Sequence, residues 1–465
     1  MSLLFLVVPQ QTFAKEYFVA VSGSDSSDGS QAKPWRNIQK ALGKVSSGDI
    51  ITVQPGNYIE SLTVAGSNLT IRANGKVTTK GWSVTGNGNT VKGFDASDPA
   101  NNAVMRTYGN DNLIEGNEIH DTLQDGVWFF GKRNTFRKNH IYNIKQRAED
   151  PHIDCFQTWG PAEDIIFEQN NCHNLNKQGS NQLVMVENQG TAAIKNLTFR
   201  NNIFIMDDPG YSPINIDRKE GQNTISGIYV YNNVFYNTAG GQNAVRLTGV
   251  DTARIQNNLI IGYGLLPSSS PYFGVVDGSH ASTDIVVSHN AIVKNPGTQL
   301  RTTSYPNDLL DVDPKIVSLA NLDFHLQPTS PLIDKGVSLA GKVTNDYAGN
   351  ARPVGSGYDI GVYEVAGSVV PTATQTIAPT KAPTSTPVKV PTSTVGPTTV
   401  LSTTPSSDVC RADINRNGKV DLADYSFLVA DFLNPNFHPE SDINQDGVVD
   451  LTDYSILVAN FLKAC

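Results

Sequence analysis

The sequence predicts an all-β solenoid, a right-handed parallel β-helix, because one short pattern of residues recurs through the middle of the chain. The pattern reads apolar, any, apolar, any, any, Asn, any, apolar, and its clearest copy lies at 195–204. There the apolar residues are Leu197, Phe199 and Phe204, and the asparagine is Asn202. Apolar residues two apart describe a strand with one buried face, which a single strand cannot bury alone. Stacked copies can bury it, so we expect a coiled parallel sheet.

Further copies of the pattern place an Asn at intervals of roughly 22 to 32 residues, a range typical of solenoids. They are centred on Asn117, Asn139, Asn170, Asn233, Asn258 and Asn290. A short amide tolerates left-handed backbone and bonds to nearby main chain, so each Asn suits a turn after a strand. Stacked Asn side chains could also bond to one another as a ladder. A β-propeller is the weaker alternative fold.

Composition allows more than one domain and argues against nucleic-acid-binding and membrane-spanning proteins. With 465 residues, 39% apolar and 17% charged, it can hold one large domain and a small one. The net charge of −9 argues against a nucleic-acid footprint. Only the start of the chain is strongly apolar, and that run is too short for a membrane span.

Residues 1–14 are typical of the apolar core of a signal peptide, with Thr12 and Ala14 at plausible cleavage positions. No Lys or Arg precedes this run, so either the true start lies upstream or the signal is weak, and a buried first strand is the alternative. Among the four cysteines, Cys172 occupies an apolar position of the pattern, and we expect a packed thiol. Cys410 and Cys465 bracket the C-terminal module and could form a disulfide that closes it.

We expect the β-helix domain to span residues 15–365. Near its start, Trp35, Ile38 and Leu42 share one helical face that can plug the open end of the coil. The first strand is then expected to begin at 50–53.

The segments 17–58 and 321–364 resemble the opening and closing segments of β-helix proteins of the pectate-lyase-like superfamily. That resemblance implies a polysaccharide-active β-helix whose two ends are capped by these segments. After the β-helix domain, residues 366–407 are dominated by Pro and Thr and show no hydrophobic periodicity. This composition predicts an extended, disordered linker.

The C-terminal module, residues 408–465, contains two copies of a calcium-binding loop. Oxygen donors stand at loop positions 1, 3, 5, 9 and 12, Gly stands at position 6, and a backbone carbonyl is available at position 7. The expected ligands are Asp413, Asn415, Asn417, Lys419, Asp421 and Asp424 in the first loop and Asp442, Asn444, Asp446, Val448, Asp450 and Asp453 in the second. Hard oxygen ligands at this spacing suit Ca²⁺, so two ions are expected.

No helix can precede either loop, because Pro-containing segments stand there, whereas near-identical helices follow both. This arrangement resembles type I dockerins over Cys410 to Cys465. The resemblance implies docking to a cohesin domain of a scaffold protein, and a calcium-stabilised spacer without a partner is the alternative. Loop positions 10 and 11, which commonly contact cohesin in dockerins, hold Leu422-Ala423 and Leu451-Thr452 rather than a Ser-Thr pair. The class of cohesin therefore stays open.

Chemistry on the β-helix is expected where outward side chains of equivalent strands form a column, with about 5 Å between coils. The second strand of each repeat supplies such a column, in the segments 126–131, 152–160, 182–188, 214–221 and 244–249. Alternation at 214–217 predicts that Asn215 and Asp217 point outward, and alternation at 245–247 predicts the same for Arg246. The phases of the other segments stay open.

This column predicts a carbohydrate-binding groove. The candidate catalytic residues are His152, Asp154, Glu187, Asp217, Lys219 and Arg246, and the candidate substrate-binding residues are Trp128, Gln157, Trp159 and Tyr211. A lyase needs a neutralised uronate carboxylate and a base such as Lys, Arg, His or Tyr. A hydrolase needs two carboxyl groups about 5 to 9.5 Å apart, which Asp154 with Glu187 or Asp217 could supply. The same carboxylates could hold a catalytic Ca²⁺, so the column alone does not discriminate.

The densest candidate segment is 149–157. Its H-x-D-x-x-Q pattern is similar to a segment of polysaccharide-active β-helix proteins of uncertain activity. Asp150-Pro151-His152 also resembles a tripeptide of mannuronan C5-epimerases, although Ile153 stands where an acidic residue follows there. The alternatives are that His152 and Asp154 cap a turn, and that the tryptophans pack between coils.

The sequence therefore predicts a secreted polysaccharide-degrading enzyme that a dockerin anchors to a cohesin scaffold. A lyase on an acidic polysaccharide such as pectate or alginate leads over a glycoside hydrolase and a uronate epimerase. The competing class is a non-catalytic carbohydrate-binding or surface-structural β-helix. The order among activities rests on the resemblance of the fold, which by itself does not imply a function.

Overall fold

The structure is a computed structural model, and the chain divides into two compact units, Met1–Thr374 and Gln375–Cys465. It describes residues 14–98, 103–145, 153–174, 182–188, 192–207, 212–219, 221–241, 243–263, 273–275, 281–294, 305–365, 411–414, 416, 419–420, 424, 428, 439–443, 448–449, 453–454 and 456–457. The expected linker at 366–407 lies outside these residues, as do all but the last residue of the expected signal peptide and both Cys410 and Cys465.

Three long parallel sheets form the first unit. Sheet 1 consists of β1 (Glu16–Val19), β2 (Ile50–Val53), β5 (Thr70–Ala73), β8 (Thr90–Lys92), β11 (Leu113–Glu115), β15 (Thr135–Arg137), β18 (Ala162–Glu168), β21 (Ile194–Arg200), β24 (Ile225–Tyr231), β27 (Val250–Gln256) and β30 (Thr283–Ser288), with β14 (Gly131–Lys132) paired to β18. Sheet 2 consists of β3 (Gly56–Tyr58), β6 (Val77–Thr79), β9 (Asp95–Ser97), β12 (Glu118–His120), β16 (His140–Tyr142), β19 (Asn171–Asn174), β22 (Ile203–Met206), β25 (Val234–Gly241), β28 (Leu259–Tyr263), β31 (Ala291–Val293) and β32 (Leu309–Leu310). Sheet 3 consists of β4 (Leu62–Val64), β7 (Trp82–Val84), β10 (Ala103–Thr107), β13 (Asp125–Phe129), β17 (Phe156–Thr158), β20 (Val184–Glu187), β23 (Ile214–Asp217), β26 (Val245–Thr248) and β29 (Phe273–Val275).

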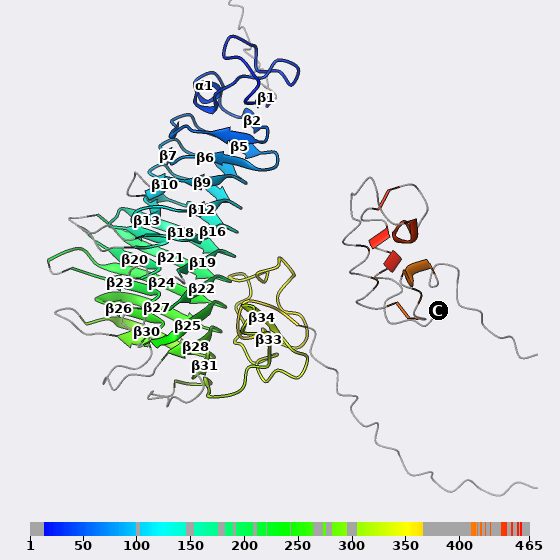
Figure 1. Ribbon diagram of the computed structural model, residues 1–465. Coiled ribbons are helices and arrows are strands. Elements are labelled where there is room, and N and C mark those ends of the chain that lie inside the picture. The colour runs from blue at the N-terminus through cyan, green and yellow to red at the C-terminus, as the bar shows by residue number, and fades with distance from the viewer. Residues whose placement is uncertain are drawn as a thin grey trace, which may run out of the picture. The chain divides into compact units, whose positions relative to one another are not determined.

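The chain visits sheets 1, 2 and 3 in turn and then begins the next coil, so every sheet grows by one strand per coil (Figure 1). All pairs between these strands are parallel. For example, Phe167 of β18 lies opposite Phe199 of β21, and Phe199 lies opposite Val230 of β24. The predicted parallel β-helix is confirmed, and the propeller alternative is wrong.

The interior of the coil is a continuous apolar core built from inward residues of all three sheets. Phe136, Phe167 and Phe199 stack face to face on successive coils of sheet 1, with ring centroids 5.2 and 4.7 Å apart. Phe204 and Phe235 stack in the same way in sheet 2, at 5.3 Å. Identical positions on successive coils thus place like side chains in contact, which explains why the sequence pattern repeats.

The predicted asparagine ladder is present at the turn from sheet 1 to sheet 2. Each Oδ1 accepts the main-chain N–H and the side-chain amide of the preceding ladder residue, as Asn202 does for Asn170 at 3.0 Å each. Asn202 in turn donates to Phe167 O and to Asn233 Oδ1. At the last rung Asp308 Oδ1 accepts the N–H of Asn290. The ladder therefore satisfies buried turn groups that no strand partner reaches.

The sequence suggested that the ladder asparagine itself has left-handed backbone. In the structure the left-handed residue is the one immediately before the ladder residue. Gln169, Asn201, Asn232 and Asn257 have φ between 52° and 61°. Their side chains leave the coil and bond main-chain groups of the closing segment 305–365. Asn201 donates to Asn345 O, and Asn232 donates to Asp359 O and Gly361 O, so adjacent residues of one turn serve two different purposes.

The closing segment, which contains the antiparallel pair β33 (Ile316–Ser318) and β34 (Asp323–Leu326), lies along the side of sheet 2 (Figure 1). Its apolar residues, among them Phe324 and Leu332, pack against Ile205, Val234 and Leu259 of the last coils. The expected cap at 321–364 is thus a lateral cover for the C-terminal half of sheet 2.

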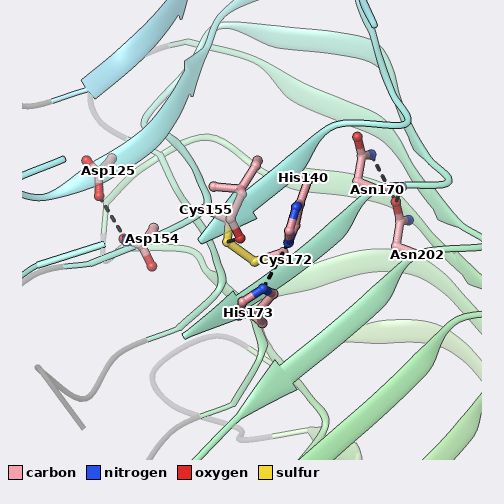
Figure 2. The surroundings of a disulfide bond; sticks show 9 residues. Asp125, His140, Asp154, Cys155, Asn170, Cys172, His173 and Asn202 are labelled. Atoms are coloured by element: carbon pink, nitrogen blue, oxygen red, sulfur yellow. Dashed lines mark hydrogen bonds between the residues drawn. A yellow bond between two sulfur atoms is a disulfide. The ribbon is translucent and has the colours of Figure 1, made fainter. Parts of the chain in front are cut away.

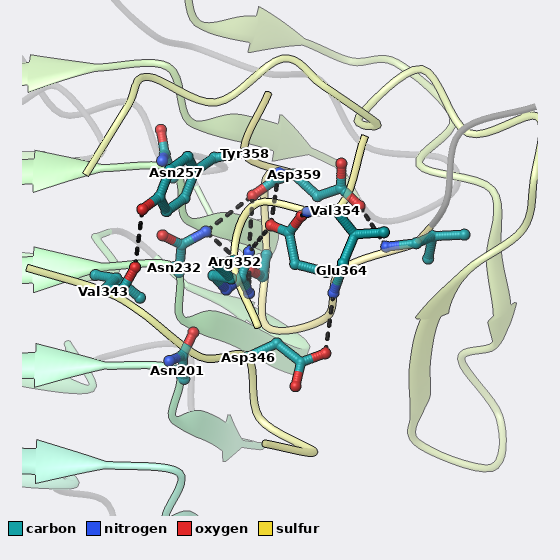
Figure 3. A network of polar contacts seen from close by, with 12 residues as sticks. Asn201, Asn232, Asn257, Val343, Asp346, Arg352, Val354, Tyr358, Asp359 and Glu364 are labelled. Carbon is teal, nitrogen blue, oxygen red and sulfur yellow. Dashed lines mark hydrogen bonds and ion pairs between the residues drawn. The ribbon is translucent and has the colours of Figure 1, made fainter. Parts of the chain in front are cut away.

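A buried polar network organises this cover (Figure 3). The guanidinium of Arg352 pairs with Glu364 at 2.5 Å and donates to Gly361 O, and both charged side chains are fully buried. Glu364 also accepts from the N–H groups of Val354 and Asp359. Because every charge here has several partners, the network can fix the irregular chain without strands.

At the N-terminal end, α1 (Ile38–Leu42) buries Ile38 and Leu42 against the first coil, as expected. Trp35 is also buried, but it precedes the helix and bridges to Val19. The first strand is β1, which pairs with β2, so the strand expected to come first is the second.

The described residues of the second unit have a small core of their own. It contains three residues of the first loop and helix and the three that stand 29 positions after them in the second copy. The pairs are Ile414 and Ile443, Val420 and Val449, and Leu428 and Leu457 (414 to 443, 420 to 449, 428 to 457). This unit also contains a short 3-10 helix, η1 (Pro439–Ser441). Across the described parts of both units, no helix has the length and apolar character needed to cross a membrane.

Candidate functional site

The outer face of sheet 3 brings together most of the predicted site residues. Strand register aligns one outward column across six coils, consisting of Arg106, Trp128, Gln157, Met185, Asn215 and Arg246. Their neighbours Val127, Phe156 and Val184 point into the core. The predicted outward orientation holds for Asp217 and Arg246, which are partly exposed, whereas Asn215 lies in the same column but is buried, at 3% exposed.

A cation held between two carboxylates forms the centre of this face. Glu187 of β20 lies opposite Asp217 of β23, and Lys219 extends back from the end of β23 between them. The Lys219 ammonium lies 3.0 Å from Glu187 Oε2 and 2.9 Å from Asp217 Oδ2. Both carboxylates are mostly buried and Lys219 is about half-exposed. The three residues form one cluster, called here the Lys219 cluster.

The pKa of Lys219 is set by two opposing effects. Burial lowers the pKa, but the hydrogen bonds and charges of Asp217 and Glu187 outweigh burial and raise it above the usual lysine value. The amine therefore carries its proton at neutral pH. It acts as a base only where the pH is alkaline or where a neighbouring negative charge is neutralised.

Arg246 lies one strand beyond the cluster, opposite Asn215. Unlike Lys219, it forms no ion pair within the part of the chain that the structure describes. Arg106, at the other end of the column, also lacks one there, and its Nε is buried without a hydrogen-bond partner. The column is thus flanked by two guanidinium groups that can receive an anion.

Aromatic side chains cover the N-terminal part of the same face. Trp128 and Trp159 meet edge to face at 5.0 Å, and Phe130 meets Trp159 in the same way at 4.9 Å. Tyr108 stacks on Phe130 and is 45% exposed. Trp128 is fixed by a 2.6 Å hydrogen bond from its Nε1 to Asp125. The tryptophans therefore pack between coils, as the alternative stated, and also leave partly exposed rings for a sugar.

The expectation that Asp154 lines the groove is wrong. Its side chain is fully buried, and neither carboxyl oxygen has a hydrogen-bond partner. The residue stands beside Asp125 of the preceding coil, whose Oδ1 accepts the Asp154 N–H (Figure 2). Burial first, and then repulsion by Asp125 and Glu187, raise the pKa of Asp154 well above its usual value. Because this carboxyl group is fully buried, it is not exposed to a substrate on the outer face.

The remaining predicted residues divide into two groups. Gln157 lies in the outward column between Trp128 and Met185, as a binding residue should. His152 and Tyr211 lie outside the described residues, so their predicted roles stay predictions. Sequence reasoning missed Arg106, because segment 103–107 was not included among the column strands although it alternates in the same way.

Cys172 is not the packed thiol that the sequence suggested. It forms a disulfide with Cys155, which immediately precedes β17 (Figure 2). Both sulfur atoms lie in the interior of the coil. The bond ties sheet 2 of one coil to the start of the sheet 3 strand that carries Gln157.

A cavity of about 460 Å³ on the outer face of sheet 1 is a competing location for a site. Its charges alternate from coil to coil, and Arg137 and Arg200 both pair with Glu168. Arg137 also pairs with Glu115. Since each of these cations has a carboxylate partner, this wall is a stabilising ion-pair ladder rather than a place for a charged substrate.

In the second unit, six of the twelve expected calcium ligands belong to the described residues. Asp413 is almost completely buried, and Asp424 and Asp453, which both stand at loop position 12, are fully buried. Lys419 and Val448, the expected carbonyl donors, are also among the described residues, as is Asp442. The ligands Asn415, Asn417, Asp421, Asn444, Asp446 and Asp450 lie outside them.

Two protein-family models match parts of the chain. The family described as "Right handed beta helix region" matches residues 44–149, and the family described as "Protein of unknown function (DUF1565)" matches residues 21–64. Both matches end before β20, so they cover the N-terminal part of the β-helix and do not include the Lys219 cluster.

Comparison with known proteins reveals similarity to polysaccharide lyases. Pectate lyase L of Dickeya dadantii (strain 3937) is 22% identical over 394 residues, which cover 73% of this chain and 89% of that protein. The structure of pectate lyase Pel9A aligns with a TM-score of 0.53 and 16% identity, over 76% of this chain and 97% of its own. A rhamnogalacturonan lyase aligns with a TM-score of 0.49 and 15% identity, over 66% and 92%. This chain therefore has a pectate-lyase-like, right-handed β-helix fold.

Proposed function

We propose that this protein is a lyase that cleaves an acidic polysaccharide of the pectate or alginate type on the outer face of sheet 3. The observation that carries the proposal is the Lys219 cluster, with Arg246 one strand away and without a carboxylate partner among the described residues. Uronate lyases need a group that neutralises the substrate carboxylate and a base that removes the C5 proton. Arg246 suits the first role and Lys219 the second.

In this proposal the uronate carboxylate binds Arg246, and this neutralisation lowers the pKa of the C5 proton. The Lys219 amine takes that proton, and the electron pair left on C5 forms a double bond to C4. The bond from C4 to the glycosidic oxygen breaks, and the departing oxygen takes a proton from water. Trp128, Trp159 and Tyr108 would stack on sugar rings on the N-terminal side.

A divalent cation such as Ca²⁺ fits the donor chemistry of the cluster, because Glu187 and Asp217 already converge on one positive group. These two residues would hold it, and a bound cation would supply further neutralisation of the uronate. Lys219 would then lose its two anionic partners, and its pKa would fall toward the range of a working base.

The test is an assay for the unsaturated, ultraviolet-absorbing product on polygalacturonate and alginate. Lys219→Ala is expected to lower the rate by about 10² to 10⁴, the usual contribution of a positioned general base. Lys195→Ala is the matched control, because Lys195 also pairs with a carboxylate, Glu163, but lies on sheet 1. Full activity in Lys219→Ala, or no product from the wild-type chain on either polymer, would refute the proposal.

A glycoside hydrolase is the second candidate, and one observation favours it. Because Glu187 and Asp217 bond the same ammonium, their carboxylates lie within two hydrogen-bond lengths of each other, close to the spacing of retaining hydrolases. Such an enzyme would produce new reducing ends without the ultraviolet-absorbing double bond.

We further propose that the protein is secreted and that its C-terminal module is a dockerin that binds two Ca²⁺ ions and a cohesin. Supporting this are the two loops in the sequence, the repeat of core residues every 29 positions and the burial of Asp424 and Asp453. Buried carboxylates at loop position 12 fit the bidentate ligand that such loops require.

A further inference from the structure

Outside the sheet 3 face, a group of histidines lies on the outer face of sheet 2, on strands that precede β22, the first strand whose side chains pack against the closing segment's apolar residues. His140 belongs to β16, and Asn171 and His173 belong to β19. Strand register sets His140 opposite Asn171 and Tyr142 opposite His173. The Nε2 atoms of His140 and His173 face each other at 2.9 Å (Figure 2).

The hydrogen bonds around His140 fix its tautomer. Its Nδ1 lies 2.9 Å from Glu118 Oε2, and a carboxylate only accepts, so Nδ1 carries the hydrogen. In the neutral ring Nε2 is therefore a lone pair directed at His173. A histidine that donates Nδ1–H to a carboxylate and presents Nε2 is the arrangement that metal sites use.

We propose that His140 and His173 bind a divalent transition-metal ion such as Zn²⁺ or Cu²⁺ through their Nε2 atoms, with Asn171 Oδ1 and water completing the coordination. Two nitrogens that each lie about 2.0 to 2.1 Å from one ion are about 2.9 Å apart at the right angle of square-planar Cu²⁺ and about 3.3 Å apart at the tetrahedral angle of Zn²⁺. The 2.9 Å hydrogen bond between the two rings therefore places both nitrogens where Cu²⁺ could replace the hydrogen, and Zn²⁺ would need them to separate by about 0.4 Å. Imidazole nitrogen selects this class of ion over Ca²⁺ and Mg²⁺.

Asn171 provides an independent indication. Its Oδ1 is buried and has no hydrogen-bond partner, although a buried acceptor without a partner is costly. It stands two residues before His173, on the same face of β19, and opposite His140. The Asn171 oxygen therefore has the free acceptor and the position on the strand face that a third ligand of the ion requires.

The site has few protein ligands. Within the described residues no group of three His, Cys, Asp or Glu side chains is arranged to hold a metal ion, so two imidazoles and an amide are its protein donors. His120, nearby on β12, does not join them, because Asp95 and Asp121 occupy both of its nitrogens at 2.9 and 2.7 Å. In the metal-free state the two Nε2 atoms share one hydrogen, and binding moves it to Nδ1 of His173.

The location suggests what the ion does. Cys172 points inward from β19 and is bonded to Cys155, whereas Asn171 and His173 point outward from the same strand. An ion would therefore hold β19 to β16 on the outer face while the disulfide holds the same region inside. Metal binding is expected to raise the temperature at which the first unit unfolds.

The experiment uses the full chain without a histidine tag, stripped of metal and supplied with excess Ca²⁺ so that oxygen-rich loops are filled. Calorimetric titration with Zn²⁺ should show one site, and the electron paramagnetic resonance spectrum of bound Cu²⁺ should show coupling to two imidazole nitrogens. His140→Ala and His173→Ala should each weaken binding at least 10-fold and leave one coupled nitrogen. Glu118→Gln should weaken it about 10-fold by releasing the His140 ring.

His325→Ala is the matched control, since His325 is an exposed histidine that also pairs with a carboxylate, Asp323. It should bind like the wild type. A wild-type Cu²⁺ spectrum with fewer than two coupled nitrogens would overturn the proposal, and so would unchanged Zn²⁺ affinity in folded His140→Ala. The spectrum of the wild type decides the question even if a variant does not fold. No result here depends on lyase activity.

Discussion

Lys219 derives its chemistry from its two neighbours. An isolated surface lysine would be a solvated charge, but here Glu187 and Asp217 hold the ammonium at about 3 Å and raise its pKa. A lyase that uses this amine must work where some of it has lost its proton. We therefore expect the rate to rise with pH through the alkaline range.

Asp217→Asn tests this electrostatic arrangement. The change removes one of the charges that stabilise the ammonium, so the pKa of Lys219 falls and the unprotonated amine becomes available at lower pH. The rising limb of the pH–rate profile should move toward neutral pH. Asp251→Asn on sheet 1 is the control and should leave the profile in place. If the rising limb of the pH–rate profile stays at the wild-type pH or moves to higher pH, the assignment of Lys219 as the base is contradicted.

The residue scale also shows where sequence reasoning succeeds and where it stops. Alternation predicted the direction of Asn215, Asp217 and Arg246, because apolar inward neighbours flank all three. Around Asp154 the neighbours Ile153, Cys155 and Phe156 are all buried, so no alternation exists to read. A fully buried carboxyl with no partner is a feature that only the packed coil reveals.

At the scale of the element, the turn between sheets 1 and 2 determines the stability of the coil. Ladder residues such as Asn202 bond the next rung and the strand before it, whereas the preceding residues, such as Asn201, secure the closing segment. The sequence predicted the ladder, because its period is visible. It could not assign the second function, since the main-chain partners lie 80 to 177 residues away in the sequence.

Asn202→Ala should destabilise the first unit by about 3 kcal/mol or more, because it removes the acceptor of the Asn170 main-chain N–H and side-chain amide and a donor to Phe167 O, all buried. The measurement is the free energy of unfolding in denaturant. Asn74→Ala is the control, since Asn74 is exposed and donates only to the side chain of Gln54 and to main chain. Equal stability of the two variants would show that the ladder contributes little.

The Cys155–Cys172 bond is another element-scale feature that the pattern concealed. Cys172 reads as an apolar position, which is correct, since its sulfur is in the core. Cys155 stands just outside a strand, and nothing in the pattern places it beside β19. Only the course of the chain from sheet 3 through sheet 1 to sheet 2 brings the two together.

The whole molecule combines two units with different requirements. The first is held by stacked apolar side chains, an amide ladder and a disulfide, whereas the second has a small core and a set of buried carboxylates. Because carboxylates at these loop positions are the ligands expected for Ca²⁺, and binding the ion contributes folding free energy, the second unit should depend on Ca²⁺ and the first should not.

Calorimetric titration should show two Ca²⁺ sites in the second unit, and Asp413→Ala should remove or strongly weaken one. Asp313→Ala is the control, because Asp313 is an exposed carboxylate of the first unit that pairs with Lys315. Chelation should abolish binding to a cohesin. Unchanged Ca²⁺ binding in Asp413→Ala would refute the loop assignment.

The central claim is that the sheet 3 face breaks a glycosidic bond by elimination rather than by hydrolysis. Digestion of polygalacturonate or alginate in ¹⁸O-labelled water, followed by mass spectrometry, tests it most directly. A lyase adds no water, so each new non-reducing end should carry an unsaturated sugar whose mass is one water less than that of the hydrolysis product. After correction for the exchange of oxygen at the reducing ends, no fragment should contain ¹⁸O at the cleaved bond. Saturated fragments that incorporate ¹⁸O, or no fragments at all, would contradict the account.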